Sequence, residues 1–416
     1  MAFEQGSQTG AGRSLGVSSG EFRAVQRDTQ GFAAVTAAGE PTTPTAAIPN
    51  LHYVFDDPND GEPGRDRMLV HGVWELVLAA AVVLASMALI SARPGALSGD
   101  SRHDILLDCT QIGLLAVASA LGLRAGVPNL AVGGIAVFAG IYVSENGSGS
   151  WGTATLTAIG IGIGIGVVQG LVVVGLHVPS WAASLGALLA LSAWSASRPP
   201  GVSQLGYAPG GDAYLWFGGF VALSVVGSIF GVAPGVRRGF ARFRPVADPA
   251  RRRTRAAALI ALGATVGSTV VAVMAGVLGA LRAPSTPAIT TTTGGLESVA
   301  LLSALGLGAA LLGGTSAFGR RGGVLGTVLA ACLLALSLAW IQAKHPSWSM
   351  EAVVAVTVGV GLAVTRLVER FGRPVLRPAT DDDDPFGLKP RGAPWRPGPT
   401  PAGGLWSSDD GWGTSG

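Results

Sequence analysis

Ten long apolar segments, separated by short polar connections, constrain the fold of this 416-residue chain more than any other feature. An apolar helix of about 20 residues can cross the hydrocarbon layer of a bilayer, because its backbone polar groups bond to one another. The segments cover Val70–Ile90, Ile105–Leu123, Pro128–Val143, Gly152–Leu176, Trp181–Ala196, Tyr214–Val232, Ala256–Leu281, Leu296–Leu312, Val324–Ile341 and Ala352–Val368. We therefore predict an all-α polytopic membrane protein with about ten transmembrane helices.

Composition supports this prediction. Charged residues make up 13% of the chain, whereas soluble domains carry about 25%. The third, fifth and eighth segments are short and interrupted by Gly or Pro, so we expect tilted, broken or re-entrant helices there. Polar sequence flanks the membrane domain, 68–372, and predicts a disordered N-terminal extension, 1–67, and a disordered C-terminal tail, 373–416.

A cluster of eight arginines between Arg237 and Arg255 predicts the orientation of the helices. Membrane proteins keep Lys and Arg on the cytoplasmic side. If this loop, within 233–255, is cytoplasmic, alternation places seventeen basic residues inside near the membrane and five outside. We therefore expect both termini in the cytoplasm and the protein in the inner or plasma membrane. The apolar flanks favour this explanation of the basic cluster over nucleic-acid binding.

Polar residues inside the apolar segments are few. They are Asp104, Asp108, Gln111, Asn129, Gln169, Ser184 and Glu297. A polar group in a membrane is costly unless it serves a solute pathway or bonds to a neighbouring helix, and for the amides the sequence leaves both explanations open. Asp104, Asp108 and Glu297 lie near the ends of their segments, where the membrane interface solvates them at low cost. The alternating glycines of Gly160–Gly166 lack the polar flanks of a phosphate loop, so we interpret them as a surface for close helix packing.

No catalytic motif or metal-ligand spacing is present, and Cys109 and Cys332 do not indicate a disulfide framework. We expect a protein that is not an enzyme, with no catalytic residue, metal or cofactor of its own. Because no nucleotide-binding motif occurs, any use of ATP would depend on a separate subunit.

Three stretches together resemble the permease subunit of bacterial ABC-type importers for monosaccharides, the ribose-type permeases. The first, Val127-Pro-Asn-Leu-Ala-Val-Gly-Gly-Ile-Ala-Val-Phe-Ala-Gly140, looks like the family's broken helix. The second runs from Gly164 through Gln169 and Val178-Pro179 to Ser184-Leu-Gly186. The third, Gly313-Gly-Thr-Ser-Ala-Phe-Gly-Arg-Arg-Gly-Gly-Val-Leu-Gly-Thr327, is the most specific of the three. The resemblance covers about Val70–Arg370.

The resemblance implies a permease that moves a sugar-like solute by alternating access. Its implied partners are a cytoplasmic ATPase subunit, an extracytoplasmic solute-binding protein, a second permease subunit in a homodimer or heterodimer, and the lipid bilayer, with no nucleic acid. The implied substrate pathway comprises Asn129, Gly133, Gly134, Gln169 and Ser184. The implied motif turn comprises Gly314, Thr315, Ser316, Gly319, Arg321 and Gly322.

The cytoplasmic loop departs from the family pattern. Coupling to the ATPase would fall on Arg237, Arg238, Arg242, Asp248 and Arg251, but the family's Asn-Pro-Glu-Ala-Ala-Arg core is absent there. Pro245 and Pro249 also oppose one long helix in this loop. The alternative is therefore a non-transporting membrane scaffold that keeps a permease-like fold and recruits partners through its basic loop and tails.

Overall fold

The computed structural model describes residues 68–198, 205, 207–232, 255–282, 292, 294–317, 324–344 and 347–371. Within these ranges the chain forms ten α-helices and one short 3-10 helix, with no β-strand. In chain order they are α3 (Met68–Ala92), α4 (Gly99–Arg124), α5 (Val132–Asn146), α6 (Trp151–Gly175), α7 (Ser180–Ala196), η3 (Pro209–Asp212), α8 (Ala213–Val232), α10 (Arg255–Leu281), α11 (Leu296–Leu312), α12 (Gly326–Lys344) and α13 (Met350–Phe371).

Each predicted apolar segment forms a helix at its expected place. Among the described residues, seven helices are long and apolar enough to cross a membrane. Large apolar side chains are exposed along several of them, for example Leu76 and Leu84 of α3, Leu156 of α6 and Leu215 of α8. Exposed apolar faces of this extent are unfavourable in water and match the interior of a bilayer. The chain is a multi-pass helical membrane protein.

The three segments predicted to be short or broken form the three shortest α-helices among the described residues. α7 and α11 have 17 residues each, and α5 has 15. At 1.5 Å per residue, α5 is about 22 Å long, which is less than the roughly 30 Å of hydrocarbon in a bilayer. α5 alone therefore does not reach across the membrane.

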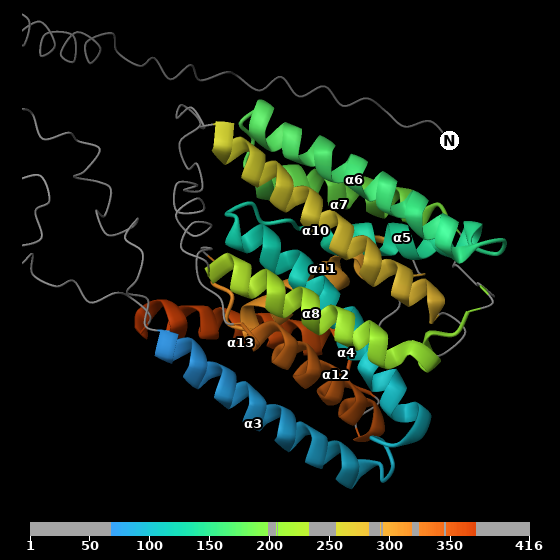
Figure 1. Ribbon diagram of the computed structural model, residues 1–416, viewed down its shortest axis with the longest axis vertical. Coiled ribbons are helices and arrows are strands. Elements are labelled where there is room, and N and C mark those ends of the chain that lie inside the picture. Colours follow the sequence, from blue (N-terminus) through green and yellow to red (C-terminus); the bar gives the residue numbers. More distant parts are fainter. Residues whose placement is uncertain are drawn as a thin grey trace, which may run out of the picture. The chain divides into compact units, whose positions relative to one another are not determined.

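A series of pairwise contacts runs from α6 to α3 across the bundle (Figure 1). α6 contacts α10, α10 contacts α4, α4 contacts α12, and α12 contacts α3. α8 packs on α4, and α13 packs on α11. The short helix α5 contacts α4, α6, α7, α10 and α11, so it is enclosed by other helices.

The sequence of α5 explains why it takes this central position. Every residue from Val132 to Ile141 is buried, and the run Val-Gly-Gly-Ile-Ala-Val-Phe-Ala-Gly-Ile contains no polar side chain. A helix that is apolar on all sides is stable only when other elements cover all sides. Its glycines and alanines let neighbouring backbones approach closely, which is how membrane helices gain packing contacts.

Two glycines mark the closest approaches around α5. A Cβ on Gly276 of α10 would lie 2.0 Å from the carbonyl oxygen of Ala136. A Cβ on Gly133 would lie 2.3 Å from the carbonyl oxygen of Val299 in α11. Both obstacles are backbone atoms, so no side-chain rotation can relieve the overlap. α10 and α11 can lie this close to α5 only because Gly276 and Gly133 have no side chain.

The alternating glycines of α6 divide between two faces. Gly162, Gly166 and Gly170 face α10, where an added Cβ would meet side chains and backbone of that helix. Gly160 and Gly164 have no neighbouring heavy atom within 4 Å of an added Cβ. The predicted packing role is therefore confirmed for one face of α6, the one that contacts α10.

Replacing Gly276 by Ala should destabilise the bundle, because the methyl group overlaps the Ala136 carbonyl. Overpacking of this kind costs about 1–3 kcal/mol. The matched substitution Gly164→Ala adds the same methyl group to open space and should leave stability unchanged or raise it by up to about 1 kcal/mol through helix propensity. Thermal unfolding of the purified protein in detergent measures both. Equal unfolding temperatures for the two variants would contradict the described approach of α5 and α10.

Candidate functional site

The connection between α4 and α5 carries Asn129, whose side chain is buried. Its Oδ1 accepts a hydrogen bond of 3.0 Å from the backbone N–H of Ala131, the residue before α5. This bond from a side chain to the backbone two residues on is an Asx turn. It fixes the direction in which the chain enters α5.

Asn129 also joins two long helices. Gln169 of α6 donates to Asn129 Oδ1 from Nε2 at 3.1 Å. Asn129 Nδ2 donates to Ser268 Oγ of α10 at 3.1 Å, and Ser268 Oγ donates in turn to the carbonyl oxygen of Ala118 in α4 at 2.8 Å. One amide side chain thus links the start of α5 to α6 and, through Ser268, to α10 and α4.

Two further serines complete the cluster. Ser303 Oγ of α11 accepts the backbone N–H of Gly133 at 2.9 Å, which satisfies one of the first amides of α5. Ser184 Oγ of α7 lies 3.4 Å from the carbonyl oxygen of Pro128 and 3.1 Å from that of Trp181. We call Asn129, Gln169, Ser184, Ser268 and Ser303 the amide–serine cluster.

Two buried oxygens near this cluster have no hydrogen-bond partner among the described residues. They are Oε1 of Gln169 and Oγ of Ser119, which follows Ala118 in α4. Amide and hydroxyl groups can both donate and accept hydrogen bonds, and no member of the amide–serine cluster is ionisable. These groups can exchange hydrogen bonds with water or with a neutral molecule that carries hydroxyl groups.

The amide–serine cluster contains some residues of the implied substrate pathway and some residues that the sequence did not single out. Asn129 and Gln169 bond directly, Ser184 contacts the carbonyl before Asn129, and Gly133 and Gly134 lie in the first turn of α5. A Cβ on Gly134 would contact Val299 and Leu191, so this position also serves packing.

Ser268 and Ser303 were missed. Each is an isolated serine in an apolar helix, where serine is common, and each bonds to a residue far away in the chain. Their separations from their partners are 139 and 170 residues. No local pattern points to such partners.

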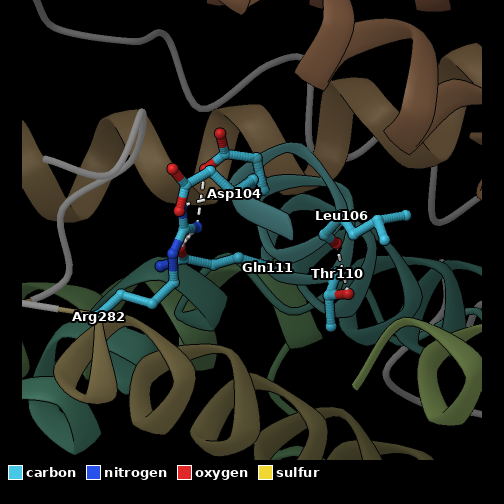
Figure 2. Close-up of polar contacts among 6 residues, drawn as sticks. Asp104, Leu106, Thr110, Gln111 and Arg282 are labelled. Carbon is cyan, nitrogen blue, oxygen red and sulfur yellow. Dashed lines mark hydrogen bonds and ion pairs between the residues drawn. The ribbon is translucent and has the colours of Figure 1, made fainter. Parts of the chain in front are cut away.

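A second polar cluster joins α4 to the end of α10 (Figure 2). Arg282 Nη1 lies 2.7 Å from Asp108 Oδ1 and 3.4 Å from Gln111 Oε1, and Arg282 Nη2 lies 3.4 Å from the carbonyl oxygen of Asp104. The Arg282 and Asp108 side chains are 3% and 11% exposed. The sequence marked the α4 residues as polar, but it did not identify Arg282 as their partner.

The Gly-Gly-Thr-Ser stretch forms the turn after α11. The N–H of Gly314 bonds to the carbonyl of Leu311, and the N–H of Thr315 bonds to that of Ala310. Together with φ of +82° at Gly314, these bonds define a Schellman motif, which favours glycine. Of the residues in the implied motif turn, Gly314, Thr315 and Ser316 lie in or directly after this Schellman turn, whereas Gly319, Arg321 and Gly322 lie outside the described residues.

Hydrogen bonds and close contacts connect the region of this turn to three other helices, α3, α12 and α13. Trp74 Nε1 of α3 donates to the Leu312 carbonyl at 2.8 Å, and Glu75 Oε1 accepts the N–H of Gly326 at 3.1 Å at the start of α12. Ser316 Oγ donates to Glu369 of α13. A Cβ on Gly326 would lie 2.0 Å from the Gly313 carbonyl oxygen, so the ends of α11 and α12 touch through glycine.

The proposed coupling residues Arg237, Arg238, Arg242, Asp248 and Arg251 are outside the described ranges. In the part of the chain that is described, no group of three or more His, Cys, Asp or Glu residues is arranged to hold a metal ion.

Comparisons with protein-family models, with curated proteins and with solved structures find no match to this chain.

Replacing Asn129 by Ala should lower the free energy of unfolding by about 1–3 kcal/mol, because the Ala131 N–H and the Gln169 amide lose a buried acceptor. Asn146→Ala is the matched control, since Asn146 is exposed and makes one bond, to the Tyr142 carbonyl at 2.8 Å. It should change stability by less than about 0.5 kcal/mol. Denaturant titration of the purified protein measures both, and equal effects would contradict a buried role for Asn129.

Proposed function

We propose that this chain is the transmembrane permease subunit of an ABC-type importer for a sugar-like solute. The observation that carries the proposal is the amide–serine cluster at the start of α5. It is neutral, rich in donors and acceptors, and lies where a short helix begins inside the bundle. Four of the five residues that the family resemblance selects for the pathway take part in it through a side chain or backbone group.

Several features of the fold support this proposal. Transporters often bind solutes where discontinuous helices begin or end near the middle of the membrane, because free backbone groups are available there. α5 is too short to cross the membrane, and Asn129 contacts Ser268 near the middle of α10. The Gly-Gly-Thr-Ser turn, the most specific part of the resemblance, joins α11 and α12 to α3 and α13.

In the proposed mechanism all ten helices contribute to the membrane domain, and both termini face the cytoplasm. The chain pairs with a second permease subunit, and a solute-binding protein delivers the solute from outside. ATP binding to a cytoplasmic ATPase subunit is transmitted through the arginine-rich loop, and the helices alternate between outward and inward openings. The solute's hydroxyl groups would exchange hydrogen bonds with Gln169 and its neighbours as it passes.

The departure of the loop from the family's coupling pattern favours one alternative, a membrane scaffold that does not transport. Basic residues next to an anionic membrane gain roughly 1 kcal/mol each, so the loop could serve lipid or partner binding instead. The two functions differ in their partners. The permease requires an ATPase subunit, and the scaffold does not.

The proposal predicts that a strain lacking this chain loses uptake of at least one monosaccharide and that the chain purifies together with an ATPase subunit. Uptake is measured with a panel of radiolabelled pentoses and hexoses. Gln169→Leu, which removes the unpaired amide oxygen from the pathway, should lower uptake by about tenfold, equivalent to 1.4 kcal/mol. Gln169→Asn keeps an amide and should retain most of the activity.

Each variant must be compared at equal abundance in the membrane, with Asn146→Ala as the control. Normal uptake of every sugar in the deletion strain, together with the absence of an associated ATPase, would refute the permease and favour the scaffold. An associated ATPase without sugar uptake would refute only the substrate class.

A further inference from the structure

The ion pair between Asp108 and Arg282 lies outside the amide–serine cluster and is not part of the proposed substrate pathway. Both side chains are buried, and they come from different helices, α4 and the end of α10 (Figure 2). Gln111 is fully buried beside them, and its Nε2 has no hydrogen-bond partner among the described residues. The two charged side chains therefore form a close ion pair, whereas the amide nitrogen of Gln111 beside them lacks a hydrogen-bond acceptor among the described residues.

Stability alone does not explain such a pair. Removing two charges from water costs about as much as their attraction returns, and apolar replacements are often equally stable. Ionisable residues inside membrane segments are therefore rare and usually serve a function. While the helices stay together, removing one partner of such a pair is costly, because the other charge stays buried. When the helices separate, water hydrates both charges and replaces the ion pair. A contact with these properties can form and break as the helices move.

The interface between α4 and α10 shows where such a switch would act. Arg282 directly follows the last residue of α10, and its N–H still bonds to the Leu278 carbonyl, as in a helix. It is fourteen residues from Ser268 and both contact α4, so they lie on the same face. Ala275 is seven residues from each and is fully buried. The ion pair therefore lies at one end of this seam between α4 and α10, and the Ser268–Ala118 bond lies near the middle of α10.

We propose that the Asp108–Arg282 pair is a latch that closes this seam on the side of the membrane opposite the arginine-rich loop. When the latch opens, the ends of α4 and α10 near Arg282 separate, while the Ser268–Ala118 contact near the middle of α10 stays in place. Water and solute then reach the amide–serine cluster along the seam. The role of the latch in transport rests on the proposed function, but the opening itself is measurable without transport.

The test places a cysteine in the seam. Ala275→Cys is introduced into a chain whose native cysteines are replaced, with Cys109→Ala and Cys332→Ala. The protein is reconstituted in lipid nanodiscs, where both faces are accessible, and its rate of labelling by a water-soluble maleimide is measured. Closure of the latch should keep this cysteine protected, so labelling of the otherwise unchanged chain should be slow.

The decisive variant is the double substitution Asp108→Asn and Arg282→Gln, which removes both charges and leaves no unpaired buried ion. If the open state is normally populated at roughly 1–10%, making it dominant accelerates labelling by roughly ten- to a hundredfold. The single variant Arg282→Gln should show the same direction. Arg198→Gln is the matched control, because it breaks a 3.7 Å pair with Glu145 whose side chains are 44% and 29% exposed. It should leave the labelling rate unchanged.

Slow labelling of the double variant in a monodisperse protein would overturn the latch. Equal acceleration by Arg198→Gln would also overturn it, because the effect would then not be specific to the buried pair. Since labelling requires neither solute nor ATPase, faster labelling without any sugar uptake would support the opening and refute the permease. Sugar uptake with unchanged labelling would refute only the latch.

Discussion

A helix that begins inside a membrane protein must find partners for its first backbone N–H groups, because neither water nor lipid supplies them. Two side chains outside α5, one just before it in the chain and one from another helix, accept N–H groups at its start. Asn129 accepts the N–H of Ala131, and Ser303 of α11 accepts the N–H of Gly133. The bonds to Gln169 and Ser268 then hold Asn129 in place. Five helices, α4, α6, α7, α10 and α11, pack against α5.

The same requirement explains the composition of the surrounding helices. A short helix enclosed on all sides needs neighbours that approach closely, and Gly276 and Gly133 provide the space. Once the backbones are that near, a few hydroxyl and amide groups suffice to satisfy the buried amides. One of these groups, Gln169 Oε1, has no hydrogen-bond partner among the described residues, and in the proposed permease it would be available to a polar solute. If the proposed permease function holds, the same residues meet both the structural and the functional requirement, and a buried ion pair lies elsewhere on the interface of α4 and α10.

Much of the fold could be predicted from the sequence, because length and hydrophobicity determine where a membrane helix forms. All ten apolar segments form helices, and the three expected to be short are the shortest. The amide–serine cluster was predicted in part, because Asn129 and Gln169 stand out as amides in apolar surroundings. Ser268, Ser303 and Arg282 could not be predicted. Their partners are 139, 170 and 174 residues away, and only tertiary packing brings them together. The permease assignment and the ten membrane crossings stay predictions.

A double-mutant cycle between Asn129 and Ser268 tests most directly whether the start of α5 is anchored to α10. The free energy of unfolding is measured for Asn129→Ala, Ser268→Ala and the double variant. Hydrogen bonds between membrane helices give coupling energies of about 0.6 kcal/mol on average and up to about 1.7 kcal/mol. A buried Asn129 that is shared between helices should fall in the upper part of that range. Additive effects, within about 0.3 kcal/mol, would show that the two residues do not interact and that the start of α5 is not anchored to α10 through them.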